Sequence, residues 1–435
     1  MPPNSKYLPP FSLEQQMVLA LVPKITAIPS IVGSVYIVQH VLRSSKRRQR
    51  TYHRLLAAMS TMDFIYAIKT FVSTWPNPEG TGYLASGTTE TCEAAAVLGH
   101  GGSLSSILYN GSLTLYYLLT IAFSWRLDKI KRIEPFLHGL PLVIGWSTAF
   151  ATLPMNLMNP IGWTCWIGSF PVSCIVNPDI ECTRGENSSI YRWVFFHAEL
   201  WACFLFSAFA MLYIYFRLRK NEVAIRKYEY EAQADADAEP DRSVENDESA
   251  QPQSGRSLIL QSGRSLMTSR RTTTGRNATS SRKQKRHNLS QRFASQAWFY
   301  ILAFCLTWIF PMITFVIAEV TGYLYFPLLA TTVVFNPMQG FFNCLIYIKP
   351  RYMRYREGLR VGANVPPSAP SQIQCFRSAL DLDAIDDEEE LEQIEGDDSE
   401  KETTQEQVEK FSDRTTEWKE QAQKKGSNQT TNNSR

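Results

Sequence analysis

The chain has 435 residues, of which 44% are hydrophobic and 20% charged, and its formal net charge is +3, averages that would also fit a soluble protein. These averages hide two unlike kinds of sequence. Long apolar, aromatic-rich stretches alternate with short charged ones, and two polar segments, at about 218–292 and 361–435, dilute the total. A window of about 19 residues, the length that crosses a bilayer, therefore describes the chain better than its mean.

Seven apolar stretches, each long enough to cross a membrane as a helix, follow one another at roughly 15–42, 53–75, 93–125, 135–154, 190–216, 294–319 and 323–348. None alternates with a period of two residues, as a strand of a membrane β-barrel would. We therefore expect an all-α membrane protein, a seven-transmembrane helix bundle at 15–348 preceded by a short extracellular N-terminus at 1–14. Pro23, Lys24 and Pro29 interrupt the first stretch, and spanning helices tolerate such prolines when neighbouring helices satisfy the freed carbonyl groups.

Lysine and arginine gather in alternate loops between these stretches. They follow the first, third and seventh stretches, as Arg43, Lys46, Arg47, Arg48, Arg50 and Arg54, then Arg126, Lys129, Lys131 and Arg132, and last Lys349, Arg351, Arg354, Arg356 and Arg360. The opposite loops, at 76–92, 155–189 and 320–322, contain a single basic residue, Arg184. Because basic loops stay in the cytosol, this pattern fits seven spans but not six. It predicts a multi-pass plasma-membrane protein with its N-terminus outside and its C-terminus in the cytosol.

Two polar segments are expected to be disordered in the cytosol. The third cytosolic loop, 218–292, is first acidic and then basic and serine-rich, and the tail, 361–435, is acidic and polar, so neither buries enough apolar surface to fold. Arg270-Arg271-Thr272-Thr273 suits a basophilic kinase, although such strings are also common by chance. Between bundle and tail, 349–360 mixes aromatic residues with arginines, which predicts an amphipathic juxtamembrane helix on anionic lipids.

Four of the eight cysteines fall on the predicted outer side, where oxidation is expected: Cys92, Cys165, Cys174 and Cys182. Their even number predicts two disulfides, and four cysteines allow three pairings. A bond from Cys92, at the outer end of the third span, to Cys165 would tie the long loop over the bundle, so we favour this pairing and a small ring between Cys174 and Cys182. Asn187-Ser188-Ser189 is the one external sequon and predicts a glycan on Asn187.

Charged side chains inside spans are costly and therefore point to function. Asp63, near the middle of the second span, is too short to reach an interface, so we expect a switching role with a polar partner or a bound cation rather than a static contact. Lys69 and Glu199 are candidate ligand contacts in the second and fifth spans. Lys24 and Glu319 lie nearer the ends of spans, where snorkelling to the interface explains them.

Proline marks two further places. In the sixth span Trp308 lies one turn before Pro311, and in the seventh Asn336-Pro337 precedes Asn343. Proline kinks a helix, and a kink beside a polar residue in each of two adjacent helices would let the helix halves swing.

Over roughly 15–360 the chain resembles a G-protein-coupled receptor, through its seven spans, its external N-terminus, a cysteine at the head of the third span and another in the second external loop. Asp63 resembles the acid that this family carries in the middle of the second span. Asn343-Cys344-Leu345-Ile346-Tyr347 resembles the Asn-Pro-x-x-Tyr motif, with cysteine in place of proline. Trp308 and Pro311 resemble the tryptophan–proline switch, with a spacing one residue longer than in rhodopsin-like members.

Other features resemble the cyclic-AMP-receptor and secretin/adhesion branches more closely, namely Gln339-Gly340-Phe341-Phe342-Asn343 and Cys165-Trp166. The rhodopsin-like Asp/Glu-Arg-Tyr is absent at the inner end of the third span, where the chain has Leu115-Tyr116-Tyr117-Leu118, so an ionic lock of the usual kind is not expected. The seventh span has no lysine, which argues against a retinal Schiff base.

The resemblance implies a receptor rather than an enzyme. An external small-molecule or peptide ligand would bind among the outer halves of the spans and shift an equilibrium between two helix packings. The candidate contacts are Lys69, His100, Trp166, Glu199 and Trp308, and a lysine and a glutamate in one cavity would suit a small polar or zwitterionic ligand.

Within the bundle the switch would involve Asp63, Trp308, Pro311, Pro337, Asn343 and Tyr347, and no cofactor is expected apart from a sodium ion near Asp63. A cytosolic cleft would receive a heterotrimeric G protein, and kinases and arrestin-like proteins would act on the loop and tail. Membrane lipids are further partners, and nucleic acid is not.

Two other functions would require features that differ from those of a receptor. A transporter or channel for a small polar solute would show corresponding halves and paired broken helices, and no such correspondence is visible. A membrane-embedded enzyme would need clustered catalytic groups, whereas His100, His138 and His197 are scattered without metal-ligand spacing.

Overall fold

The structure is a computed structural model that describes residues 11–175, 179–237, 294–321 and 324–363. The predicted kinase motif, almost all of the predicted tail and most of the predicted third cytosolic loop lie outside these residues. The first half of the described chain is helical apart from its connections. Its elements are α1 (Leu13–Arg43), α2 (Ser45–Arg48), α3 (Thr51–Val72), α4 (Thr89–Tyr117), the π-helix η2 (Leu118–Ala122) and α5 (Leu127–Ala151).

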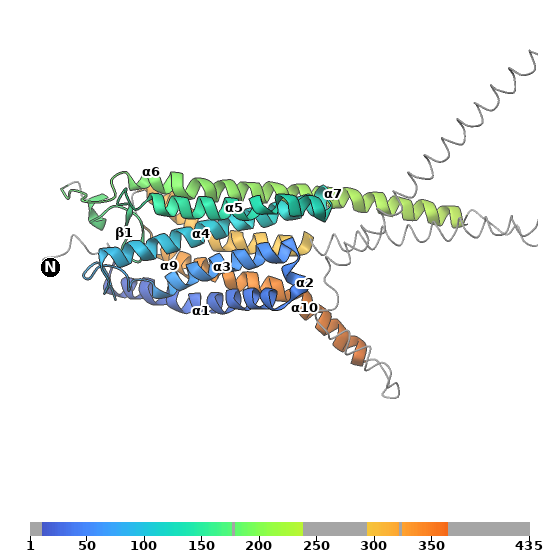
Figure 1. Ribbon diagram of the computed structural model, residues 1–435, viewed down its shortest axis with the longest axis horizontal. Coiled ribbons are helices and arrows are strands. Elements are labelled where there is room, and N and C mark those ends of the chain that lie inside the picture. The colour runs from blue at the N-terminus through green and yellow to red at the C-terminus, as the bar shows by residue number, and fades with distance from the viewer. Residues whose placement is uncertain (1–10, 176–178, 238–293, 322–323, 364–435) are drawn as a thin grey trace, which may run out of the picture. The chain divides into compact units, whose positions relative to one another are not determined.

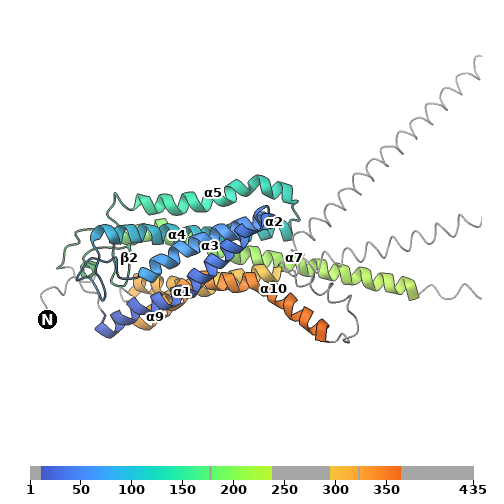
Figure 2. The same cartoon turned by 60° about the horizontal axis from the view of Figure 1, so that its bottom comes forward.

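The second half continues the bundle. Its helical elements are the 3-10 turn η3 (Val172–Ile175), α6 (Ser188–Arg192), the π-helix η4 (Trp193–His197), α7 (Ala198–Asp237), an unlabelled helix at Ala294–Thr321, α9 (Phe326–Phe335), the 3-10 turn η5 (Asn336–Met338) and α10 (Gln339–Ala363). Figures 1 and 2 show the long helices lying side by side, with α4 between α3 and α5. The described residues thus form an all-α bundle of seven long helical segments.

Four helices of the described part are long and apolar enough to cross a membrane by length and composition alone: α1, α3, Ser188–Ala224 and Ala294–Thr321. The third predicted span, α4, differs because it is rich in glycine, serine and other small polar residues. Most of these are buried among other helices, and Ser103 and Thr114 donate hydrogen bonds to carbonyls of their own helix. A central helix that faces protein needs no apolar surface for lipid.

Glycines allow several of these helices to approach closely. A Cβ atom on Gly145 of α5 would lie 2.2 Å from Ser105 Oγ and 2.9 Å from the Ser105 backbone nitrogen of α4. A Cβ atom on Gly340 of α10 would lie 2.3 Å from Ser34 Oγ of α1. Close backbone contact through small residues is the usual way in which helices pack inside a membrane.

One end of the bundle, the disulfide end, is covered by the connection between α5 and α6. Its strands β1 (Met158–Pro160) and β2 (Cys165–Ile167) pair antiparallel, with Asn159 opposite Trp166. The structure confirms both predicted disulfides: Cys92–Cys165 joins α4 to β2 with 5.4 Å between the Cα atoms, and Cys174–Cys182 closes a local ring. Arg184 adds an ion pair with Glu93 of α4. This connection is therefore fixed over the end of the bundle.

The boundaries differ most from the sequence prediction at two places. Residues 218–237 were expected to be disordered, but α7 continues to Asp237. This segment is rich in alanine, glutamate, lysine and arginine, which are strong helix formers. The expected juxtamembrane helix at 349–360 is not a separate element, because α10 runs through Pro350 to Ala363 (Figure 2).

Candidate ligand pocket and its polar connection

A cavity of about 1120 Å³ lies at the disulfide end of the bundle. Its walls come from α1, α3, α4, the connection between α5 and α6 with η3, α6, η4, the helix Ala294–Thr321, α9 and η5. Large aromatic side chains make up much of the lining: Phe11, Trp163, Trp166, Phe196, Trp308 and Phe315. A concave, mainly apolar space with a few polar groups is the usual form of a small-molecule site.

The cavity brings together some of the predicted contacts. Lys69, Trp166 and Trp308 line it, as do Pro311 and Pro337. Lys69 Nζ lies 2.5 Å from Thr164 Oγ1, so the lysine joins α3 to the segment that follows α5. Whether these residues contact a ligand stays a prediction.

Among the described residues, His100 does not line the cavity but lies fully buried behind its wall. Trp166 Nε1 donates to His100 Nδ1 at 3.3 Å, and His100 Nε2 lies 3.3 Å from Thr148 Oγ1. Since Nδ1 accepts a hydrogen bond, the ring proton is on Nε2, and His100 orients the indole of Trp166. Its position indicates support of the wall rather than direct contact.

Glu199 is likewise not one of the described lining residues; the acid that lines the cavity is Glu319. Glu319 accepts a hydrogen bond from Ser189 Oγ at 2.7 Å and lies 3.9 Å from an Arg192 guanidinium nitrogen. Glu319 therefore has polar partners at the end of its helix, and its expected snorkelling stays a prediction. Lys24 lies outside the lining, where its ammonium donates to the backbone carbonyls of Phe71 and Val72 at the end of α3.

A chain of hydrogen bonds leads from the cavity into the bundle. Trp308 Nε1 donates to Gln339 Oε1 at 2.6 Å, and Gln339 Nε2 donates to Ser106 Oγ at 3.2 Å. Ser106 Oγ donates to one carboxylate oxygen of Asp63 at 2.5 Å, and Asn343 Nδ2 donates to the other at 2.8 Å. This Trp308–Asn343 chain joins the helix Ala294–Thr321 to α10, α4 and α3.

The same contacts bear on the sodium ion that the sequence suggested at Asp63. Both carboxylate oxygens accept hydrogen bonds from protein donors, and Ser106 Oγ also accepts one from Gln339. A hard cation needs several oxygen ligands that are free to face it. Each Asp63 oxygen thus has one protein donor and keeps a further lone pair, and a sodium ion near Asp63 stays a prediction.

The opposite end of the bundle carries the basic residues of 43–54 and 126–132 and is called the basic end. Tyrosine side chains pack together there. The Tyr52 hydroxyl of α3 lies 3.3 Å from that of Tyr300 and accepts a hydrogen bond from Gln296 Nε2 at 2.8 Å, both in the helix Ala294–Thr321. The rings of Tyr116 and Tyr117 pack against Tyr52. These contacts tie the first turns of the helix Ala294–Thr321 to α3 and α4.

Tyr347, one turn beyond Asn343, lies at the same end. Its hydroxyl is 2.8 Å from His40 Nδ1 of α1, and its ring meets that of His53 of α3 edge-on. Lys349 Nζ lies 3.2 Å from the centre of the Phe299 ring, which joins α10 to the helix Ala294–Thr321.

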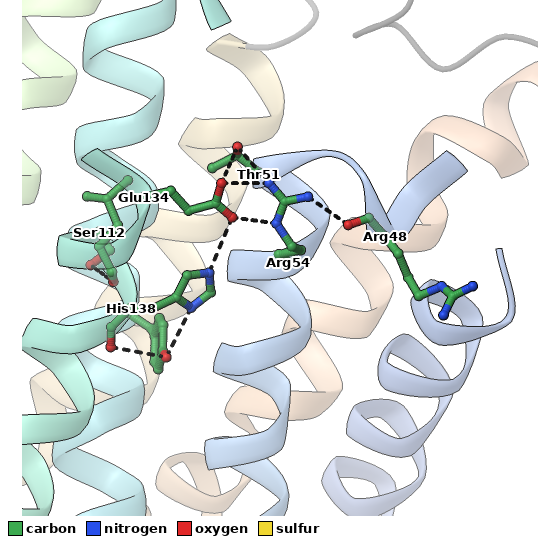
Figure 3. A network of polar contacts seen from close by, with 8 residues as sticks. Arg48, Thr51, Arg54, Ser112, Glu134 and His138 are labelled. Carbon is green, nitrogen blue, oxygen red and sulfur yellow. Dashed lines mark hydrogen bonds and ion pairs between the residues drawn. The ribbon is translucent and has the colours of Figure 1, made fainter. Parts of the chain in front are cut away.

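A second polar network at the basic end centres on Glu134 of α5 (Figure 3). Its carboxylate forms a two-pronged ion pair with the Arg54 guanidinium of α3 and accepts a hydrogen bond from Thr51 Oγ1 at 3.0 Å. His138 Nε2 lies 3.6 Å from the same carboxylate, and His138 Nδ1 lies 3.3 Å from the Tyr109 hydroxyl of α4. Arg54 was expected only as a basic loop residue, but the network links α3, α4 and α5.

Asn187 precedes α6 in the left-handed region, with φ of 56°, and its exposed side chain lies at the cavity. An exposed position suits a glycan, and the modification stays a prediction.

Sequence reasoning missed Ser106, Arg192 and Gln339. Ser106 is one of several serines in α4, and Gln339 was noted only as part of a family motif. No spacing rule singles out Arg192, because its role depends on Glu319 in a helix far along the chain.

Comparison with known proteins identifies a similar fold but no protein of similar sequence. No family model matches the chain, and no curated protein matches it. Among solved structures it is similar to the crystal structure of squid rhodopsin, with a TM-score of 0.51, 10% sequence identity and coverage of 87% of this chain and 92% of the other. At 10% sequence identity the similarity is evidence for the fold alone. The chain therefore shares the seven-helix fold of this rhodopsin.

Proposed function

We propose that the chain is a G-protein-coupled receptor of the plasma membrane that binds an extracellular ligand and signals to a heterotrimeric G protein. The observation that carries the proposal is the Trp308–Asn343 chain, because it starts at the wall of the cavity and crosses four helical elements. A buried polar network is sensitive to the loss of any one member, so a ligand that moves Trp308 would affect the contacts of Asp63 through this chain.

The orientation follows from the chemistry of the two ends. Disulfides form in oxidising surroundings, so the disulfide end would face outward. The loops at the other end carry the lysines and arginines that stay in the cytosol. A ligand would therefore enter from outside, and a G protein would meet the basic end.

Signalling would use two packings of the helix Ala294–Thr321. In the closed packing its first turns contact Tyr52 and Lys349. A ligand that repositions Trp308 would disturb the hydrogen bond to Gln339 and hence the contacts of Asp63. The ligand can shift the equilibrium only by its differential affinity for the two packings. Movement at Pro311 and Pro337 would then open the basic end.

The branch of the receptor family and the further partners are also part of the proposal. We place the receptor nearest to the cyclic-AMP-receptor and secretin/adhesion branches on the strength of the motif around Gln339 and of Cys165-Trp166. Kinases and arrestin-like proteins would act on segments outside the described residues, and lipids would surround the bundle.

Co-expression with a panel of G proteins, with guanine-nucleotide exchange as the readout, tests the proposal. We expect wild type to give a basal signal with at least one G protein and Asp63→Asn to raise it severalfold, because the variant loses one hydrogen bond that holds the closed packing. Glu14→Gln, at the exposed start of α1, is the control and should match wild type. Silence of wild type and Asp63→Asn across the panel, with both at the cell surface, would refute receptor coupling.

A further inference from the structure

We infer that the cavity binds a monoanionic ligand, a carboxylic acid with a large apolar body, and that Lys69 is its counter-ion. The inference deepens the proposed function and rests on it for the role of the cavity.

The charges of the cavity do not balance. The charged side chains among the described lining residues are Lys69, Arg192 and Glu319. Glu319 lies 3.9 Å from Arg192, so these two neutralise each other. The polar contact of Lys69 is the neutral hydroxyl of Thr164, and no carboxylate of the described residues lies within ion-pair distance of its ammonium. One positive charge therefore has no partner in this part of the structure.

An unpaired ammonium in such a place is costly. Lys69 lies in a spanning helix and is only partly exposed. The cost of holding a charge inside a membrane protein falls sharply when an opposite charge binds it. An ammonium has three N–H donors, and Thr164 occupies one of them. Two donors remain for the oxygens of a carboxylate.

The lysine is also held in position from two sides. A Cβ atom on Gly99 of α4 would lie 2.8 Å from Lys69 Cδ and 2.9 Å from Lys69 Cε, so the stem of the lysine lies against this glycine. Thr164 fixes the head of the side chain. Any larger residue at position 99 would displace the stem, which makes Gly99 a second determinant of the site.

The rest of the cavity suits an apolar body. Trp163, Trp166, Phe196 and Trp308 present large aromatic surfaces to a space of about 1120 Å³. This volume lies just above the range of roughly 300–1,000 Å³ common for small-molecule sites. A small zwitterion, as the sequence suggested, would leave most of these rings uncovered, whereas a long-chain or polycyclic acid would cover them.

Thermal unfolding of the purified protein in nanodiscs tests the inference without any G protein. The probes are straight-chain carboxylates of eight to eighteen carbons and indole-3-acetate, each beside its primary amide and its amine. We expect at least one acid to raise the Tm of wild type by several degrees and its amide and amine to leave it unchanged. Failure of every acid, or equal stabilisation by an amide or amine, would overturn the inference.

Substitutions at Lys69 and Gly99 test whether Lys69 is the counter-ion of the acid. Lys69→Met should weaken binding of the acid at least tenfold, Lys69→Arg should retain most of it, and Gly99→Ala should weaken it while keeping the charge. Lys24→Met is the matched control, since Lys24 is a lysine of α1 bound to backbone carbonyls outside the cavity. Undiminished binding by both Lys69→Met and Gly99→Ala would refute the site. Acid binding without nucleotide exchange would refute the receptor function alone, and activation by an uncharged ligand would refute this inference alone.

Discussion

Single residues in the bundle differ in how completely their polar groups are satisfied, and the members of the Trp308–Asn343 chain are linked to one another by hydrogen bonds. Each oxygen of Asp63 accepts one hydrogen bond, while Ser106 and Gln339 each donate one and accept one. Removing a member of such a chain leaves its neighbours buried without partners, which costs more than the bond contributes.

Gln339→Leu tests this completeness. The variant keeps the size of the side chain but leaves Trp308 Nε1 without its acceptor and Ser106 Oγ without its donor. We expect the free energy of unfolding to fall by about 1–3 kcal/mol, measured by thermal unfolding in detergent. Thr331→Val, which loses only a hydrogen bond to its own helix, should stay within about 0.5 kcal/mol of wild type. Equal stability of Gln339→Leu and wild type would contradict the assigned contacts.

Glu134→Gln tests the network at the basic end. The Arg54–Glu134 pair is largely shielded, with 33% and 12% of the side chains exposed, so loss of the carboxylate charge should lower the unfolding free energy by about 2 kcal/mol. Asp128→Asn is the control in the same helix, because its pair with Arg126 is mostly exposed and is worth about 0–1 kcal/mol. If both variants unfold at the same temperature, Glu134 does not hold α3 to α5.

At the scale of elements, the bundle depends on a few close approaches. Gly145 brings α5 against the backbone of α4 at Ser105, while Gly139, less than two turns earlier in α5, has open space in front of it. These two glycines form a matched pair in one helix.

Gly145→Ala should force α5 away from α4, because the added Cβ would meet backbone as well as a side chain. We expect a loss of about 1–3 kcal/mol, measured as a lower Tm in detergent. Gly139→Ala should be neutral or raise stability by up to about 1 kcal/mol, since alanine favours helix. The reverse order of the two Tm values would show that the helices do not pack here.

The tyrosine contacts at the basic end predict how readily the first turns of the helix Ala294–Thr321 open locally. Tyr52→Phe keeps the ring but removes the hydroxyl that contacts Tyr300 and Gln296. Amide hydrogen exchange over 294–303 should rise severalfold, because these turns lose their polar tie to α3. Tyr213→Phe on the exposed face of α7 should leave exchange there unchanged. Unchanged exchange in Tyr52→Phe would show that the hydroxyl does not restrain this helix.

At the scale of the whole molecule, the fold class could be predicted from the sequence, because hydropathy and charged loops are local properties of a membrane chain. Both disulfides were predicted because the charged loops also assign the four cysteines to the outer side. The Trp308–Asn343 chain could not be, since helix rotation decides whether Ser106 or a neighbouring serine faces Asp63. Helix rotation also decides that Lys69 lines the cavity and that Glu199 is not among its described lining residues, so the sequence could not distinguish the two. The helix that runs to Asp237 was not predicted because low apolar content indicates disorder, whereas the alanine, glutamate, lysine and arginine of this segment also favour helix.

A receptor must be able to open at the basic end, and a distance between spin labels measures this directly. Labels at Lys131 of α5 and Ser295 of the helix Ala294–Thr321, both exposed, would be introduced as cysteines after the free cysteines are replaced. We predict two distances, with the longer one a minority in wild type and severalfold more populated in Asp63→Asn. A single distance that is the same in wild type and Asp63→Asn would contradict a two-state receptor controlled by the Trp308–Asn343 chain.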